Sequence, residues 1–205
     1  MTANEYLETE VKLYLHDMGS VAARLVAAGA TTQLPRVLER NVRYDNAERS
    51  MMDSGIVVRL RQDYRTLLTY KEPSAQKDDV ALTRFEVSVE VDNFDAMQII
   101  LEKLGYTRVM VYEKQRTTYL LHNAEVVLDE MPYGDFMEIE GQPDDIRWII
   151  ERVSLGDAPR FKCSYVELFE RVCHHLKLDL RDLTFANFEG IKVPLAAFDP
   201  VDEQP

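Results

Sequence analysis

The sequence is poor in the features that mark disulfide-rich, zinc-binding and membrane-spanning proteins. Its two cysteines, Cys163 and Cys173, have no Cys-x-x-Cys or Cys/His ligand spacing, which argues against a disulfide framework and a zinc site. Both are expected to be small side chains, buried or half-buried. No apolar run approaches the roughly 20 residues of a membrane span, and the N-terminus has neither a basic segment nor the apolar run of a signal peptide. A cytoplasmic protein is therefore expected.

Basic residues are outnumbered by acidic ones. Lys and Arg total 24 against 36 for Asp and Glu, and the formal net charge is −12. General binders of nucleic acid or of membrane surfaces need a basic exterior, so neither kind of partner is expected. Any polyanion that this protein binds must meet a local basic site.

The length of 205 residues suits one domain with a sizeable core, and no linker divides the chain. We therefore expect a single domain over residues 1–205. A strand-rich part should occupy about 5–142, followed by C-terminal helices and a tail over about 143–205.

An alternation of charged and apolar residues near the N-terminus predicts a strand over residues 6–15. Glu8, Glu10 and Lys12 share one parity, while apolar residues such as Val11 and Leu13 take the other. A strand with this pattern has one ionic face and one apolar face. Taken alone, it is most simply a half-buried strand whose ionic face meets water.

The same alternation returns in strand after strand. Further strands are expected at 31–45, 56–62, 66–71, 80–91, 106–121, 125–130 and 136–141. Helices are expected at 21–28, 93–104, 144–154 and 164–176, with an irregular tail over 181–205. In the strand over 31–45 the pattern leaves open which parity faces inward.

Two architectures can accommodate charged residues on one parity of nearly every strand. In a sandwich, that parity faces water. In a closed barrel, the charged parity lines the interior, and eight strands leave room there for side chains or one small ligand. We predict the second, an α+β fold with an eight-stranded antiparallel β-barrel and flanking helices.

The charged parity carries residues of both signs. Bases suited to a ligand with several negative charges are Lys12, Arg59, Arg61, Lys71, Arg84, Lys114 and Arg116. Acids suited to hard divalent cations are Glu8, Glu10, Glu86, Asp129, Glu138 and Glu140. A polyphosphate with Mg²⁺ or Mn²⁺ would satisfy both sets together.

Several of these residues fall in short motifs that occur in a fixed order. They are Glu8-x-Glu10-x-Lys12, Val57-Val58-Arg59-Leu60-Arg61, Tyr70-Lys71, Arg84-x-Glu86, Glu113-Lys114-Gln115-Arg116, Leu128-Asp129 and Gly134-Asp135-Phe136-Met137-Glu138-Ile139-Glu140. In this order they resemble the motifs of the CYTH superfamily, the triphosphate tunnel metalloenzymes, from about residue 5 to 141 and less specifically to 169. That superfamily includes class IV adenylyl cyclases, thiamine triphosphatases and inorganic triphosphatases. The resemblance implies a tunnel, open at both ends, that binds a triphosphate group and a divalent metal.

The resemblance also implies roles for individual residues. The metal-binding acids would be Glu8, Glu10, Asp129, Glu138 and Glu140. The groups that hold phosphate oxygens would be Arg59, Arg61, Lys71, Arg84, Lys114, Arg116 and Lys162, with Glu86 and Arg43 in support. Lys12 would lie close to the attacked phosphorus and would position or activate the nucleophile, because phosphoryl transfer depends mainly on alignment and charge neutralisation.

Two departures from the family pattern bear on the reaction. Arg43 stands where the family often carries a tyrosine that partners the motif lysine, so a Lys–Tyr dyad is not expected. Class IV cyclases have a His-Phe pair just before the first strand, whereas this chain has Asn4-Glu5-Tyr6-Leu7. These differences favour a hydrolase of tripolyphosphate or of an organic triphosphate, with a class IV adenylyl cyclase as the alternative and a non-catalytic polyphosphate-binding module as the third. A homodimer, common in the family, is neither required nor excluded by the acidic exterior.

Other conspicuous residues are predicted to have structural roles. His174-His175 should be at the surface or in packing, and Asp144-Asp145 should begin a helix. Trp148 lies between Ile146 and Ile149 and is expected to belong to the core.

Overall fold

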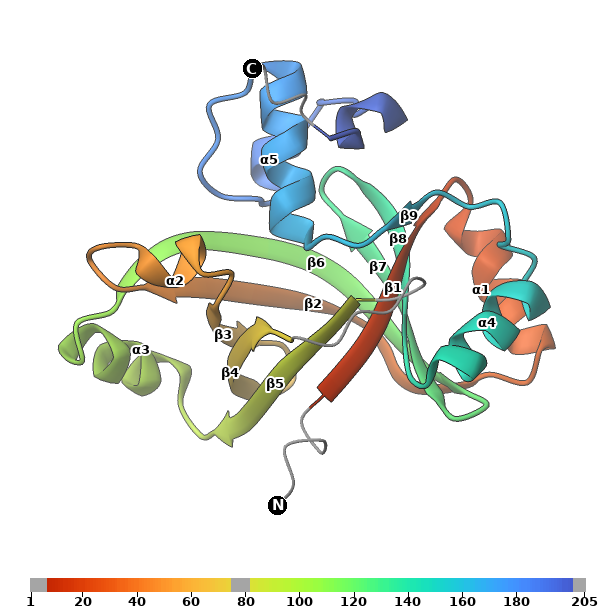
Figure 1. Ribbon diagram of the computed structural model, residues 1–205, viewed down its shortest axis with the longest axis horizontal. Coiled ribbons are helices and arrows are strands. Elements are labelled where there is room, and N and C mark those ends of the chain that lie inside the picture. Colours follow the sequence, from red (N-terminus) through yellow and green to blue (C-terminus); the bar gives the residue numbers. More distant parts are fainter. Residues whose placement is uncertain (1–6, 75–81, 201–205) are drawn as a thin grey trace.

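Eight antiparallel strands close into a ring (Figure 1) in the computed structural model, which describes residues 7–74 and 82–200. These strands are β1 (Leu7–Leu15), β2 (Thr31–Asp45), β3 (Val57–Gln62), β4 (Thr66–Pro73), β5 (Leu82–Val91), β6 (Thr107–Leu121), β7 (Ala124–Met131) and β8 (Gly134–Glu140). The predicted eight-stranded antiparallel fold is confirmed. The expected beginnings of the first strand at Tyr6 and of the fifth at 80–81, and the segment Asn4-Glu5-Tyr6, lie outside the described residues.

The ring closes through a pairing between elements far apart in sequence. The hydrogen-bonded order is β5-β4-β3-β2-β6-β7-β8-β1, and β1 pairs in addition with β5 from Leu7↔Phe85 to Glu10↔Leu82. A short ninth strand, β9 (Arg160–Phe161), pairs with β1 further along. All of the strand pairs are antiparallel, and closure leaves no edge on the ring where β1 and β5 meet.

The helices lie outside the strands, and the side chains of Asp17, Asn93 and Ser164 cap three of them. The helices are α1 (Met18–Ala27), α2 (Ser50–Asp53), α3 (Phe94–Lys103), α4 (Pro143–Arg152) and α5 (Tyr165–Leu176), followed by two 3₁₀ turns at Ala186–Phe188 and Leu195–Phe198. Asn93 caps α3, and Ser164 with Glu167 forms a capping box at the start of α5. Among the described residues, no helix combines the length and apolar character needed to cross a bilayer.

The apolar parity of the strands faces outward and is covered by helices. Val11, Leu13 and Ile139 pack with Ile146 and Ile149 of α4 in a core that α1 also joins, and Figure 1 shows α1 and α4 together on one side of the ring. On another side, α3 covers a second core formed by strands β2, β3 and β6. The helices therefore cover apolar strand faces, while the charged parity is left to the interior.

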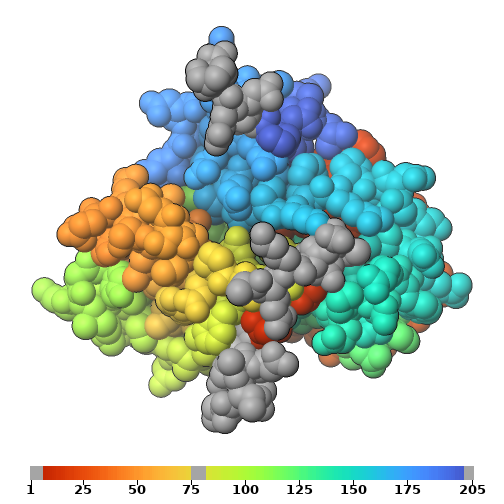
Figure 2. All heavy atoms as spheres, in the orientation of Figure 1, coloured from red at the N-terminus to blue at the C-terminus, as the bar shows by residue number. Residues whose placement is uncertain are grey.

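At one end of the ring the inward-facing positions change from charged to apolar. Tyr14 follows Lys12 on the same parity, and Phe136 precedes Glu138. These aromatic side chains pack in a third core with α5 and with the C-terminal tail, including Phe198. Figure 2 shows α5 and the tail, in blue, at the top of the molecule. The resemblance implied a tunnel open at both ends, but this aromatic core fills the end beneath α5.

The expectation that Trp148 belongs to the core is wrong. Its side chain is 40% exposed and stacks on His122, with ring centroids 4.8 Å apart. The reason is helical spacing, since Ile146, Ile149 and Ile150 take the buried face of α4 and leave position 148 on the other face. The remaining structural expectations are confirmed: Asp144 and Asp145 occupy the first turn of α4, His174 and His175 are exposed, and Cys163 and Cys173 are free thiols, buried and half-buried.

Candidate functional site: a charged cavity inside the ring

A cavity of about 380 Å³ lies inside the ring. The predicted site residues that line it are Glu8, Glu10, Lys12, Arg43, Arg59, Arg61, Lys71, Arg84, Glu86, Lys114, Arg116, Glu138 and Glu140. They come from seven different strands, and the ring brings them together because each occupies an inward parity. The structure thus assembles in one place most of the residues that the sequence pattern selected.

Two predicted residues do not line the cavity. Lys162 is exposed. Asp129 lies on the inward parity of β7 but is fully buried, and both of its oxygens accept hydrogen bonds. Its donors are Arg116 Nε at 2.7 Å, Arg116 Nη2 at 2.6 Å, Lys114 Nζ at 3.1 Å and Tyr165 Oη at 2.8 Å. Asp129 therefore holds two cationic side chains in place, and the metal-binding role that the resemblance implied for it stays a prediction.

Lys12 lies deep in the wall and is paired with a single carboxylate. Its Nζ is 2.6 Å from Glu138 Oε1, and the residue is only 2% exposed. Burial by itself would lower the pKa of Lys12, but Glu138 and Glu10 outweigh it and raise that pKa above the ordinary value. Conversely, Lys12, Lys114 and Arg116 hold the pKa of Glu138 well below its ordinary value despite burial. Both groups are therefore charged at neutral pH.

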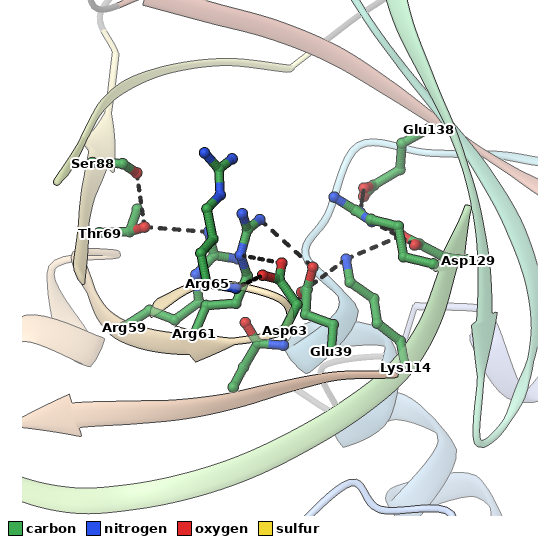
Figure 3. A network of polar contacts seen from close by, with 12 residues as sticks. Glu39, Arg59, Arg61, Asp63, Arg65, Thr69, Ser88, Lys114, Asp129 and Glu138 are labelled. Carbon is green, nitrogen blue, oxygen red and sulfur yellow. Dashed lines mark hydrogen bonds and ion pairs between the residues drawn. The ribbon is translucent and has the colours of Figure 1, made fainter. Parts of the chain in front are cut away.

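A chain of ion pairs links β2, β3 and β6 inside the ring. Glu39 Oε2 lies 3.6 Å from Arg61 Nη1, and Glu39 Oε1 lies 3.4 Å from Lys114 Nζ (Figure 3). Glu39 is 1% exposed, and Asn41 donates a 2.9 Å hydrogen bond to it. Burial would raise the pKa of Glu39, but Lys114, Arg116 and Arg61 lower it far below its ordinary value. The inward parity of β2, which sequence left open, is thus the one that carries Glu39 and Asn41.

Other guanidinium groups in the cavity are incompletely paired. Arg43 and Arg59 lie directly opposite each other on β2 and β3, and the buried Nε of each has no hydrogen-bond partner. Arg59 has one carboxylate nearby, Glu86 at 3.7 Å, while Arg43 has none within 4 Å among residues 7–74 and 82–200. Burial and the neighbouring Arg84 and Arg59 lower the pKa of Arg43. A buried cation without a partner is costly, so this side of the cavity is suited to an anion.

Glutamates on three adjacent strands face one another at the other side of the cavity. Glu125 of β7 lies opposite Glu140 of β8, which lies opposite Glu10 of β1. Burial, together with Glu8, Glu125 and Glu10, raises the pKa of Glu140 to about 7. Like charges in register repel, and an added cation would relieve that repulsion.

The acidic side has the donor chemistry of a divalent-metal site. Carboxylate oxygens are the ligands that Mg²⁺ and Mn²⁺ prefer. Such an ion would also relieve the repulsion between Glu140 and the neighbouring glutamates. Within the described parts of the chain, no three acidic, histidine or cysteine side chains already surround a common point as metal ligands do. The donors therefore fit the metal in kind, with Glu8, Glu10 and Glu140 as the candidates that carry the fewest cationic contacts.

Several residues of the site were not selected from the sequence, and Glu39, Glu125 and Tyr165 are among them. Glu39 could have been found once the inward parity of β2 was known, because it lies on the same parity as Asn41 and Arg43. Glu125 could have been found from its register with Glu140. Tyr165 lies on α5, outside the strands, and its place against Lys12 carried no periodic signal.

Solved structures share this fold. A protein from Vibrio parahaemolyticus named "putative adenylate cyclase" aligns with a TM-score of 0.67 at 20% identity, over 80% of this chain and 98% of that one. The PH1819 protein of Pyrococcus horikoshii aligns with a TM-score of 0.61 at 26% identity, over 80% and 98%. An adenylyl cyclase homologue from Hippeastrum aligns with a TM-score of 0.57 at 18% identity, over 80% and 95%.

Sequence comparison points the same way. A protein of Methanocaldococcus jannaschii, also named "putative adenylate cyclase", is 26% identical over 142 residues, which are 68% of this chain and 79% of that protein. The model of the CYTH domain matches residues 7–153, the greater part of the chain and all eight strands of the ring. This protein therefore belongs to the CYTH domain family.

Proposed function

We propose that this protein is a divalent-metal-dependent triphosphate hydrolase that acts on inorganic tripolyphosphate or on an organic triphosphate. The observation that carries the proposal is the division of one cavity into two sides. Underpaired guanidinium groups at Arg43 and Arg59 face a row of carboxylates at Glu10 and Glu140, with Lys12 in the wall. A chain of phosphates with an attached divalent cation needs both sides at once.

The cationic side would bind the phosphate oxygens. Arg59, Arg84 and Arg43 would make the primary contacts, because guanidinium groups form paired hydrogen bonds with phosphate oxygens. Lys114 and Arg116 would stay in fixed positions, since Asp129 accepts hydrogen bonds from both. Asp129 is thus proposed as the anchor of these cations and not as a metal ligand.

The acidic side would hold Mg²⁺ or Mn²⁺ through Glu8, Glu10 and Glu140. A bound divalent cation neutralises charge on phosphate oxygens and lowers the pKa of a coordinated water. Glu138 would act differently, because its two oxygens already contact Lys12 and Arg116, at 2.6 and 2.7 Å. It would hold Lys12 beside the phosphorus under attack, where a positive charge stabilises the charge that develops in phosphoryl transfer.

Hydrolysis is preferred over cyclisation because the described residues that line the cavity include few aromatic side chains on which an adenine ring could stack. Among the described residues, the aromatic side chains that line it are Tyr112 and Tyr165. Tyr112 accepts a 3.1 Å hydrogen bond from Arg59, and Tyr165 is enclosed against Lys12 and Asp129. The class IV adenylyl cyclase remains the second candidate, supported by the name of the Methanocaldococcus jannaschii relative. The Hippeastrum protein, which shares the fold, is described as having a dominant triphosphatase activity.

The test is a substrate screen with the purified full chain. Tripolyphosphate, thiamine triphosphate and ATP are each incubated with Mg²⁺ or Mn²⁺, and both phosphate and cyclic AMP are measured. Release of phosphate without cyclic AMP is the expected result. Cyclic AMP from ATP would favour the cyclase, and binding without either product would favour a non-catalytic module.

Two arginine variants make the screen specific to the cavity. Arg59→Gln should lower kcat/KM by about 100-fold or more, since a lost charge-assisted contact to the transition state costs about that much. Arg147→Gln is the matched control, because Arg147 lies on the outside of α4 and is 50% exposed. If the two variants had equal activity, the cavity would not be the site of reaction.

A further inference from the structure

Tyr165, the first residue of α5, lines the charged cavity. Its ring centroid is 4.3 Å from Lys12 Nζ and 5.2 Å from Lys114 Nζ. Its hydroxyl donates a 2.8 Å hydrogen bond to Asp129 Oδ2, and the residue is 7% exposed. The ring is therefore held against two buried ammonium groups.

The orientation of this ring is fixed from two directions. The hydroxyl is tied to Asp129, and the backbone carbonyl of Tyr165 accepts a 2.8 Å hydrogen bond from Tyr133 Oη. The capping box of Ser164 and Glu167 also fixes the first turn of α5. Since Tyr165 lies at the first position of that helix, the backbone contacts fix where its side chain begins, and the ring cannot swing away from Lys12 without breaking the hydrogen bond to Asp129.

We propose that Tyr165 is a positioning residue that holds the Lys12 ammonium group in the place where it serves the reaction. On one side Lys12 is attracted by Glu138 at 2.6 Å, and on another it rests on the face of Tyr165. A cation above an aromatic face is attracted to the ring quadrupole, more strongly when water is excluded. Without the ring, Lys12 would be guided only by carboxylates and would be free to turn toward Asp129 or Glu10.

The carboxylate contacts alone leave the position of Lys12 open because they do not limit its side chain on every side. Glu138 is itself shared with Arg116, at 2.7 Å. The ring supplies a flat wall that limits how far Lys12 can move, and it contacts Lys114 as well. Tyr165 itself does not exchange protons in this scheme, because burial and Asp129 raise its pKa well above the ordinary value.

This inference extends the site beyond the segment that defines the family. The family model ends at residue 153, whereas Tyr165 belongs to a helix that the aromatic core docks onto the ring. The part of the chain that closes one end of the ring therefore also completes the surroundings of Lys12. The role in the reaction rests on the proposed function, but the contact itself is testable without it.

The kinetic test compares two substitutions that separate the ring from the hydroxyl. Tyr165→Leu removes the ring and should lower kcat by about 30-fold, the value of a desolvated cation–π contact, while KM changes by less than about 3-fold. Tyr165→Phe keeps the ring and should stay within about 3-fold of the parent in both constants. Asp129 still accepts hydrogen bonds from Arg116 and Lys114 in either variant.

A matched control removes a different ring from the same helix. Phe169 is 4% exposed and packs in the aromatic core against Phe188, with centroids 6.0 Å apart. Phe169→Leu should lower stability but leave kcat close to the parent value. A fall in kcat equal to that of Tyr165→Leu would show that loosening α5 is sufficient, and the positioning role would be overturned.

A second measurement does not depend on turnover. In protein labelled with ¹³C at lysine, the ε-methylene protons of Lys12 should be shifted upfield by the ring and can be assigned with Lys12→Arg. The shift should persist in Tyr165→Phe and disappear in Tyr165→Leu. An unchanged Lys12 signal in Tyr165→Leu would overturn the inference. If the signal moves as expected but the parent protein hydrolyses no triphosphate, the proposed function fails while the positioning of Lys12 by Tyr165 stands.

Discussion

Replacing Glu140 by glutamine should stabilise the metal-free protein at alkaline pH, although the residue lies in the middle of the site. Glu140 is partly buried between Glu125 and Glu10 on the neighbouring strands, and these acids contribute with burial and Glu8 to its raised pKa. The glutamine keeps the shape of the side chain and removes the charge. The repulsion in this row of glutamates should therefore decrease.

The magnitude follows from the pKa. An ordinary value of 4.5 is raised to about 7 in the fold, and each unit of difference corresponds to about 1.36 kcal/mol. Because the folded pKa is the higher one, the unfolded chain loses this proton first as pH rises, and stability falls between about pH 4.5 and pH 7. Above pH 7 the ionised Glu140 costs about 3 kcal/mol, and at pH 5 it costs less than about 1 kcal/mol.

The measurement is urea unfolding followed by circular dichroism in EDTA, at pH 5 and at pH 8. Glu140→Gln should exceed the parent by about 2–3 kcal/mol at pH 8 and by less than about 1 kcal/mol at pH 5. Glu151→Gln, an exposed glutamate on α4, serves as the control and should show no such pH dependence. The reasoning is refuted if the difference between Glu140→Gln and the parent is the same at both pH values.

Added metal should reverse this order of stability, so that the parent becomes more stable than Glu140→Gln. An ion that binds only the folded state stabilises it in proportion to the logarithm of its concentration above the dissociation constant. Titration with Mg²⁺ or Mn²⁺ at pH 8 should therefore raise the stability of the parent more than that of Glu140→Gln. Equal gains in the two proteins would place the metal elsewhere than at Glu140.

Three further predictions concern other charges of the cavity. Lys12→Met should destabilise the protein by about 3–5 kcal/mol, because it leaves the carboxylate of Glu138 buried without its closest partner; in urea unfolding, the double variant Lys12→Met/Glu138→Leu should recover part of this loss. Glu39→Gln should lower stability most at pH 7, because a carboxyl whose folded pKa is depressed contributes its stability in full above its unfolded pKa; the difference from the parent should shrink as pH falls below about 4.5 and vanish only as pH falls through the far lower folded pKa; acid titration of the two proteins checks this. Arg43→Gln should weaken binding of tripolyphosphate by about 10-fold or more in calorimetry without loss of stability, since its buried cation lacks a carboxylate partner among the described residues.

Much of the site could be predicted from alternation alone. Glu8, Glu10 and Lys12 share one parity of β1, and a strand places such residues on one face whatever it pairs with. The same reasoning correctly selected Arg59, Arg84 and Glu138 as residues of one interior. It could not decide the inward face of β2, because both parities of that strand carry polar side chains.

Pairing between distant strands decided which charges meet. The row of Glu125, Glu140 and Glu10 exists only through the registers of β7 with β8 and of β8 with β1. Register depends on how the whole sheet buries its apolar face, and a shift by one residue would turn these glutamates outward. The raised pKa of Glu140 is therefore a property of the closed ring, not of its own strand.

The sequence by itself thus determined the eight strands, the ionic face of most of them and the family that these motifs resemble, because side-chain parity and motif order are local. Tertiary structure alone decided that α5 closes one end of the ring, that Asp129 is buried among its hydrogen-bond donors and that Tyr165 rests against Lys12. These facts depend on how a C-terminal helix docks on an aromatic core formed from β1, β6 and β8. Docking of this kind depends on the shape and packing of residues far apart in the chain, which no periodicity records.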